Sequence, residues 1–338
     1  MLIYEYILME LSQPFIYKYR PTSLDHFEIT EDFKSIIRTL LNMNALNILL
    51  FGDSGSGKSS IIHAILLEYY NTRTLPTENV MFINSLKEQG ITFYRNDVKT
   101  FCQTASLIPG KKKIIVLDDL DIINEQSQQV FRNCIDKYSH TVHFIGSCTN
   151  TQKVIDSMQS RMTILKVKMV PREGMLKIIR HICEHEAIAI LPAAEEFIVS
   201  ISNSSVRTIV NYLEKFKLLQ MPVTLELACS VCTNISFQDF ITYTTLLKVD
   251  RNRSKAIDFM YSLFDRGYSV MDILDNYFMF IKTTDLLTEL EKFNIIPYIC
   301  KYITIFHNVH EDEIELALFT NELFGLLTPN DMLAATAT

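Results

Sequence analysis

Eight consecutive residues fit completely the pattern G-x-x-x-x-G-K-[ST] of a phosphate-binding P-loop. They are Gly52-Asp53-Ser54-Gly55-Ser56-Gly57-Lys58-Ser59. In this pattern the glycines allow a tight turn whose successive N–H groups point at phosphate oxygens, and the following helix adds the positive end of its dipole. We expect Lys58 to reach the β- and γ-phosphates of a nucleoside triphosphate, and the Ser59 hydroxyl to bind Mg²⁺. The flanks argue against a chance turn, because the apolar run Asn47–Phe51 precedes the pattern and apolar residues at helical spacing follow it.

A pair of carboxylates follows a second apolar run. Ile114–Leu117 is followed at once by Asp118 and Asp119. If this run is a strand beside the P-loop, Asp118 is placed to hold Mg²⁺, directly or through water, and Asp119 to polarise the attacking water. A solvated strand end with ordinary acids is the alternative. Together the two segments predict a P-loop NTPase, although they do not say what the hydrolysis drives.

The apolar pattern of the first half predicts the sheet that carries these motifs. Five short runs are rich in Ile, Val, Leu and Phe: Asn47–Phe51, Val80–Asn84, Ile114–Leu117, His143–Ser147 and Ile164–Val167. Strands that are covered on both faces have this composition, and helix-length segments lie between the runs. We therefore expect an α/β fold, with a mostly parallel sheet flanked by helices.

Strand signals almost vanish after Pro171. Apolar residues at spacings of three and four predict helices over Arg172–Glu186, Ala193–Ser202, Val206–Leu219, Leu225–Val231 and most of Phe237–Leu327. A small helical domain is thus expected to follow the sheet, and a second helical unit to begin near Thr233.

Composition and charge narrow the class of protein. The formal net charge of −7 argues against a general nucleic-acid coat, so any DNA contact is confined to a local basic surface. Seven scattered cysteines fit a reducing intracellular compartment, and the close pair Cys229 and Cys232 is expected to be two buried residues on one helix face. Met1–Met9 lacks the basic start of a signal peptide, and no apolar run reaches the roughly 18 residues of a membrane span. We expect a soluble protein without a membrane partner.

Several segments resemble, in the right order, motifs of the replication factor C subunits, which are AAA+ clamp loaders. They are Pro14–Pro21 with Ser23-Leu24; Asn84, Glu88, Gly90 and Ile91; Gln128-Gln129 with Lys137–Ser139; Ser160–Met162; Val206-Arg207; and Gly267–Ser269 with Asp272–Leu274. The resemblance covers roughly residues 14–327. It implies an N-terminal extension over residues 1–13, an AAA+ ATPase domain over 14–169, a helical lid over 170–232 and a helical collar for oligomerisation over 233–338.

The resemblance also implies roles for residues around the nucleotide. The segment Tyr17 to Pro21, in particular Tyr17, Arg20 and Pro21, would lie near the adenine. Thr149 falls at the sensor 1 position, with Asn150 beside it as a substitute.

Two arginines are assigned to the γ-phosphate on the same basis. Arg207 would reach the γ-phosphate from the lid of the same subunit, and Arg161 would act in trans as an arginine finger on ATP of the next subunit. A guanidinium suits this role because it neutralises charge on the transferring phosphoryl group. An ordinary surface ion pair is the alternative for Arg161.

The partners that the resemblance implies are other clamp-loader subunits, a PCNA-like sliding clamp and primer–template DNA. A pentamer is expected, with a hetero-oligomer favoured. Arg95 and Lys99 are four residues apart on one helix face and would meet DNA phosphates, although the sequence alone favours a solvated face as the explanation of this spacing. The basic run Lys111–Lys113 is expected to be a solvated loop.

Departures from the family pattern leave alternatives open. Asp119 stands where Glu is usual, Thr149 where Asn is common, Met162 where Cys is usual and Phe15 where Trp is common, while Thr208 and Asn133 replace basic residues. Slow hydrolysis is therefore expected, and a subunit that holds ATP structurally is one alternative. Another AAA+ motor, such as a helicase loader or a branch-migration enzyme, is a second.

Divergence and composition indicate a source, and the resemblance implies a site of action. The divergence and the richness in Ile, Asn and Tyr point to an AT-rich genome, such as that of a large DNA virus. The site of action would be the nucleus of a eukaryote or a viral replication site.

Overall fold

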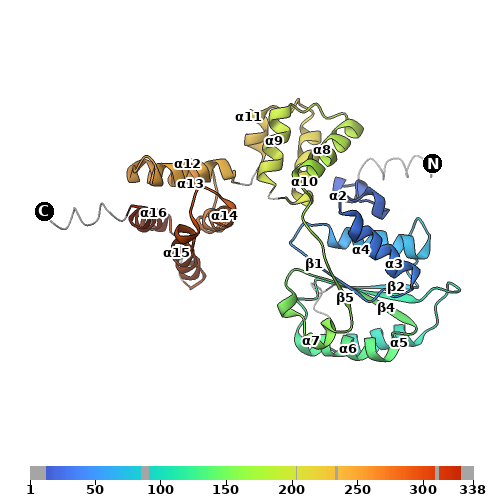
Figure 1. Cartoon of the computed structure of the whole chain (residues 1–338). Coiled ribbons are helices and arrows are strands. Elements are labelled where there is room, and N and C mark those ends of the chain that lie inside the picture. Colours follow the sequence, from blue (N-terminus) through green and yellow to red (C-terminus); the bar gives the residue numbers. More distant parts are fainter. Residues whose placement is uncertain (1–12, 85–90, 203, 233–234, 309–311, 329–338) are drawn as a thin grey trace. The chain divides into compact units, whose positions relative to one another are not determined.

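The computed structural model describes residues 13–84, 91–202, 204–232, 235–308 and 312–328, and the chain divides into two compact units, Met1–Cys232 and Thr233–Thr338 (Figure 1). Residues 1–12 of the predicted extension over residues 1–13, and the motif residues Glu88 and Gly90, lie outside the described residues.

A five-stranded parallel sheet forms the centre of the first unit. Its strand order is β2-β3-β4-β1-β5. The strands are β1 (Ile48–Phe51), β2 (Val80–Asn84), β3 (Lys113–Asp118), β4 (Val142–Cys148) and β5 (Thr163–Lys166). The predicted parallel sheet is confirmed, and each strand end lies within one residue of the apolar run that predicted it.

Helices cover both faces of this sheet (Figure 1). Helices α3 (Glu31–Asn42) and α4 (Lys58–Tyr70) lie on one face, and α5 (Ile91–Gln103), α6 (Glu125–Tyr138) and α7 (Asp156–Gln159) on the other. Alternate residues of a strand point to opposite faces, so Leu50 packs in the cluster of α3 and α4, and Leu49 in that of α5, α6 and α7. Burial on both faces explains the continuous apolar runs.

Four helices follow the sheet in the first unit: α8 (Arg172–Glu186), α9 (Pro192–Ile201), α10 (Val206–Leu219) and α11 (Leu225–Val231). They share one apolar cluster, and the short helix α2 (Phe15–Lys18) inserts the buried side chain of Phe15 into it. The segment that resembles the family's opening motif therefore packs on the helices that follow the sheet.

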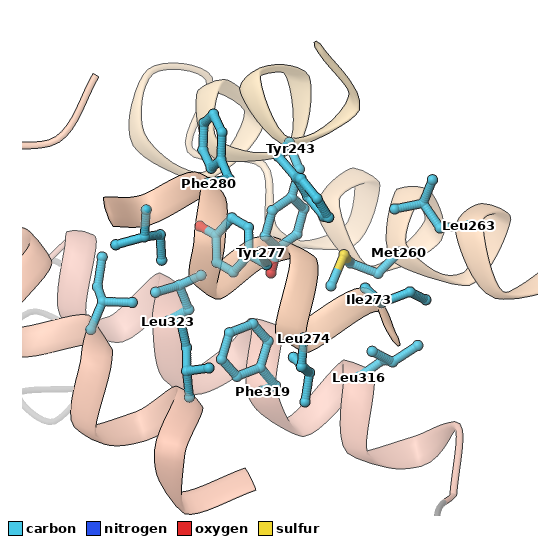
Figure 2. Close-up of a cluster of buried hydrophobic side chains, with 14 of the residues drawn as sticks. Tyr243, Met260, Leu263, Ile273, Leu274, Tyr277, Phe280, Leu316, Phe319 and Leu323 are labelled. Carbon is cyan, nitrogen blue, oxygen red and sulfur yellow. The ribbon is translucent and has the colours of Figure 1, made fainter. Parts of the chain in front are cut away.

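The second unit is helical throughout its described residues, with α12 (Phe237–Lys248), α13 (Arg253–Asp265), α14 (Val270–Thr283), α15 (Glu289–Asn308) and α16 (Ile314–Leu327). Its core is rich in aromatic rings (Figure 2). The hydroxyls of two buried tyrosines are paired, Tyr243 with Thr320 at 2.9 Å and Tyr277 with Thr244 at 3.3 Å. The unit therefore satisfies its buried hydroxyls internally.

Two local predictions are wrong. Lys113 does not lie in a solvated loop; it begins β3, is buried, and donates to the carbonyl oxygen of Phe101 and the hydroxyl of Thr104 at the end of α5. A cation is favourable there because the last carbonyls of a helix carry partial negative charge. Cys229 is exposed, and of the close cysteine pair only Cys232 is buried, because the helix turns the former away from the core.

Candidate nucleotide-binding site

A pocket of about 260 Å³ opens where the P-loop meets the carboxyl ends of β3 and β4 and the first turn of α10. The predicted site residues that line it are Arg20, Pro21, Ser54, Gly55, Gly57, Lys58, Ser59, Asp118, Asp119, Thr149 and Arg207. Tyr17, Gly52, Asp53, Ser56, Asn150, Lys99 and Arg161 are not among the lining residues. The carboxyl edge of a parallel sheet is the usual place for a ligand in this class of fold.

The P-loop connects β1 to α4, and its glycines are required by the backbone. Gly55 and Gly57 have φ values of 79° and 91°, in the left-handed region that favours glycine. A Cβ on Gly55 would also lie 2.3 Å from the Ser205 hydroxyl, at the start of α10. The loop and the helix that carries Arg207 are therefore in direct contact.

Lys58 is the first residue of α4, and its ammonium group lies inside the curve of the loop. It donates to the carbonyl oxygens of Gly52 at 2.7 Å and Asp53 at 2.9 Å. Burial lowers the pKa of Lys58, although the carboxylates of Asp119, Asp121 and Asp118 oppose this effect. The cation is thus held at the place where a P-loop binds phosphate.

The proposed metal ligands meet at the end of β3. The Ser59 hydroxyl lies 3.1 Å and 3.0 Å from the two carboxylate oxygens of Asp118. The buried Ser147 hydroxyl of β4 donates to Asp118 Oδ1 and accepts from the Asp119 N–H at 3.0 Å. A hydroxyl and a carboxylate fit the preference of Mg²⁺ for hard oxygen ligands. Sequence reasoning missed Ser147, since its role depends on β4 lying beside β3.

Asp119 has a left-handed backbone conformation and a carboxyl group whose pKa is raised. Its φ of 52° is left-handed, a conformation in which Asp and Asn are several-fold enriched among residues other than glycine. Burial raises its pKa, helped by the negative charges of Asp118 and Asp121 and partly offset by Lys58 and Arg207. A carboxylate with a raised pKa is a stronger base, which suits a group that polarises water.

The two residues predicted for the sensor 1 position, Thr149 and Asn150, have different surroundings in the structure. Thr149 lines the pocket, whereas the Asn150 side chain accepts from the Gln152 N–H at 2.9 Å and caps the short helix η2 (Thr151–Lys153). Both residues are held by Asp121, whose Oδ2 accepts from the Thr149 hydroxyl and from both backbone N–H groups. Sequence reasoning missed Asp121; its only signal was a third acid in Asp118-Asp119-Leu120-Asp121.

The N-terminal segment forms another wall of the pocket. Arg20 donates to the carbonyl oxygen of Ser59 at 2.7 Å and fixes this segment to the start of α4. Tyr17 is 60% exposed and points elsewhere, whereas Tyr19 lines the pocket and donates to Glu186 of α8 at 2.5 Å. Of the predicted segment Tyr17 to Pro21, the residues Tyr19, Arg20 and Pro21 line the pocket, and Tyr17 does not.

The two predicted arginines lie in different places. Arg207 lines the pocket from α10. Arg161 instead donates to Asp136 of α6 and to the carbonyl oxygen of Ser157. The surface ion pair considered for Arg161 is thus present, and Arg161 is positioned away from this chain's own pocket. Lys99 is exposed on α5, and the side chain of Arg95 lies outside the described part of the chain.

Residues 48–168 match the family model for the ATPase family associated with various cellular activities (AAA). Replication factor C subunit 4 of Schizosaccharomyces pombe is 26% identical over 85% of this chain and 83% of its own length. The replication factor C small subunit of Methanococcus maripaludis is 28% identical over 86% of this chain and 91% of its own. A putative replication factor C small subunit of Acanthamoeba polyphaga mimivirus is 26% identical over 83% and 88%, respectively.

Among solved structures, the RuvB Holliday junction branch migration motor of Thermotoga maritima matches with a TM-score of 0.52 over 69% of this chain and 80% of its own. Its identity of 18% shows a shared fold alone. With the pocket and the family match, the fold defines an AAA ATPase. Over more than four-fifths of its length, the chain is similar to replication factor C subunits, as its motifs predicted. In the described residues, no helix is long and apolar enough to pass through a membrane.

Proposed function

We propose that this ATPase is a clamp-loader subunit, which binds ATP and Mg²⁺ and uses hydrolysis to load a ring-shaped sliding clamp onto primer–template DNA. One observation carries the proposal: a pocket lined by the P-loop, Lys58, Ser59 and Asp118 occurs in a chain whose relatives, over more than four-fifths of its length, are replication factor C subunits. These relatives do not favour the structural-ATP subunit or another AAA+ motor.

The pocket residues divide the chemistry among them. Lys58 would bind the β- and γ-phosphates, while Ser59 and Asp118 would hold Mg²⁺, which neutralises charge on the phosphates. Asp119 would accept a proton as water attacks the γ-phosphorus and the bond to the ADP oxygen breaks. Arg207, on the helix that touches the P-loop, would contact the γ-phosphate from the same subunit. Slow hydrolysis because of the short Asp119 side chain remains a prediction.

Arg161 supports assembly into a multi-subunit complex. An arginine finger must reach a γ-phosphate, and Arg161 is not among the residues lining this chain's pocket. Action on the ATP of a neighbouring subunit would satisfy this requirement. In a pentamer, the helical unit from residue 233 would form the collar, and Lys99 with Arg95 would contact the DNA backbone without reading its sequence.

Steady-state ATPase activity tests the proposal, measured for the chain with partner subunits, with and without primed DNA and a PCNA-like clamp. We expect DNA and clamp to stimulate turnover, and Lys58→Ala to reduce it by about 100-fold or more, the usual loss when a donor to transition-state charge is removed. For turnover in the absence of DNA, Lys99→Ala is the matched control, since Lys99 is exposed and outside the pocket. Turnover that no combination of DNA and clamp stimulates would contradict the proposal.

A further inference from the structure

The turn after β3 is hydrogen-bonded to the end of β4 at the edge of the nucleotide pocket. Asp121 lies in this turn, and its Oδ2 atom accepts three hydrogen bonds: from the Thr149 hydroxyl at 2.5 Å, from the Thr149 N–H at 3.1 Å and from the Asn150 N–H at 3.1 Å. The neighbouring Leu120 N–H also donates to the Ser147 carbonyl oxygen at 2.8 Å. Position and orientation of Thr149 are therefore fixed by the chain segment that carries Asp119.

The hydrogen bond between Thr149 and Asp121 has a defined direction. A threonine hydroxyl has one proton to donate and two lone pairs to accept with, whereas an ionised carboxylate can only accept. Burial would raise the pKa of Asp121, but the hydrogen bonds from Thr149 and Asn150 outweigh it and keep the pKa below its usual range. The single hydroxyl proton of Thr149 is thus donated to Asp121 at neutral pH.

The remaining side of the Thr149 hydroxyl can only accept. Thr149 is exposed and lines the pocket with Asp119 and Lys58. The oxygens of a triphosphate offer lone pairs, so two acceptors would face each other if Thr149 met the γ-phosphate. A water molecule offers protons and is the complementary partner.

We propose that Asp121 is a positioning residue for ATP hydrolysis: it takes the hydroxyl proton of Thr149, so that Thr149 accepts a hydrogen bond from the attacking water and does not donate to the γ-phosphate. The inference rests on the proposed ATPase function. Thr149 and Asp119 then each accept one hydrogen bond from this water, and a lone pair on the water oxygen is left to attack phosphorus. This arrangement would raise the rate of the chemical step and not the affinity for ATP, because the ground-state contacts of ATP do not involve Thr149.

Four variants of the full chain separate this role from a structural one. Thr149→Val removes the hydroxyl at nearly constant shape, Asp121→Asn removes the charge, and the third variant combines both. Thr149→Ser retains the hydroxyl and serves as the conservative control. Thermal melting of each variant verifies that the fold is retained.

The first measurement is the turnover of ATP with partner subunits, primed DNA and clamp. Thr149→Val and Asp121→Asn should each lower kcat by about 10-fold, the size expected for one lost hydrogen bond in the transition state. The double variant should fall no further than the single variants, because residues that act through one another are not additive. Thr149→Ser should retain most of the activity. Unchanged kcat in both single variants, or additive losses in the double variant, would overturn the proposal.

The second measurement is independent of turnover. Dissociation constants for Mg²⁺–ATPγS and Mg²⁺–ADP are compared on the chain alone. In Thr149→Val, the ratio of the two dissociation constants should stay within about 2-fold of that of the unaltered chain, since no ground-state hydrogen bond to the γ-phosphate is lost. A selective loss of ATPγS affinity would show that Thr149 donates to the terminal phosphate and would overturn the proposal. If the unaltered chain shows no stimulated turnover, the proposed function fails, and this comparison still decides the direction of the Thr149 hydrogen bond.

Discussion

Hydroxyl groups are used in opposite ways at the nucleotide pocket and in the core of the C-terminal unit. At the pocket, the hydroxyls of Ser147 and Thr149 donate to the carboxylates of Asp118 and Asp121, beside open space. In the C-terminal core, by contrast, the hydroxyls of Tyr243 and Tyr277 pair with buried threonines.

The hydroxyls at the pocket serve the chemistry of the site, and the hydroxyls in the C-terminal core serve the stability of the fold. Neutral hydroxyl pairs in a closed core contribute about 1 kcal/mol each to folding and offer nothing to a ligand. Hydroxyls that donate to carboxylates at a pocket wall hold the negative charge of the carboxylate in place. They also leave the lone pairs of the hydroxyl oxygen to accept hydrogen bonds where a ligand can bind. Substitutions at the pocket should therefore change turnover, and substitutions in the C-terminal core should change stability with nucleotide binding intact.

The largest expected effect concerns Arg161, which tests whether the pocket is complete within one chain. In the assembled complex, Arg161→Ala should lower stimulated turnover by about 1,000-fold, the lower part of the range for arginine fingers. Nucleotide affinity of the isolated chain should not change, because Arg161 is not a lining residue. Arg132→Ala is the matched control, since Arg132 pairs with the same Asp136 carboxylate. Equal losses in both variants would show that Arg161 only maintains this ion pair.

A core variant should give the converse result. Phe319 is fully buried and meets the ring of Tyr277 edge-on (Figure 2). It also meets the ring of Tyr302 edge-on. Phe319→Ala should destabilise the C-terminal unit by about 4 kcal/mol, from lost burial and the cavity left behind. Urea titration followed by pulsed hydrogen–deuterium exchange of α14 peptides would measure this loss. A comparable loss in β4 peptides, or weaker nucleotide binding, would contradict the separation of the two regions.

Acid should affect the two units unequally. His143 of β4 is buried against Asn44 and Tyr69, and burial, followed by the charge of Lys112, lowers its pKa to about 4. Because the unfolded chain binds this proton near pH 6.5 and the folded chain does not, stability falls as the pH drops from 6.5 to 4, by about 3 kcal/mol.

The same exchange experiment at pH 7 and pH 5 would detect this loss in β4. The described core cluster of the C-terminal unit contains no histidine, so α14 peptides should change less. His143→Gln should reduce the pH dependence, while His140→Gln, at an exposed position, should leave it unchanged. An equal acid response of β4 and α14 would refute this prediction.

The smallest expected effect is that of Tyr243→Phe. The change removes one hydroxyl from the C-terminal core but leaves Thr320 paired with the Leu316 carbonyl oxygen. We expect a loss of about 1 kcal/mol in the stability of that unit. ATP turnover should be unaltered, and a fall in kcat would indicate that this core acts on the pocket.

The features that were predictable from the sequence are those with a local signal. The P-loop is a contiguous pattern, and the strands are apolar runs because both faces of the sheet are covered. The features that were missed depend on tertiary contacts: Ser147 and Asp121 act through residues 28 or 29 positions away, on a neighbouring strand or turn. Lys113 was misjudged for the same reason, since Thr104, which accepts from its ammonium group, lies at the end of a helix distant in the sequence.

The most direct test of the central claim is clamp loading itself. A fluorescent PCNA-like clamp would be incubated with the chain, its partner subunits and primed DNA blocked at both ends, and the clamp retained on DNA after a salt wash would be counted. The account predicts retention that requires ATP and primed DNA and is lost in Lys58→Ala. Retention that does not depend on ATP, or no retention by a complex that hydrolyses ATP, would contradict it.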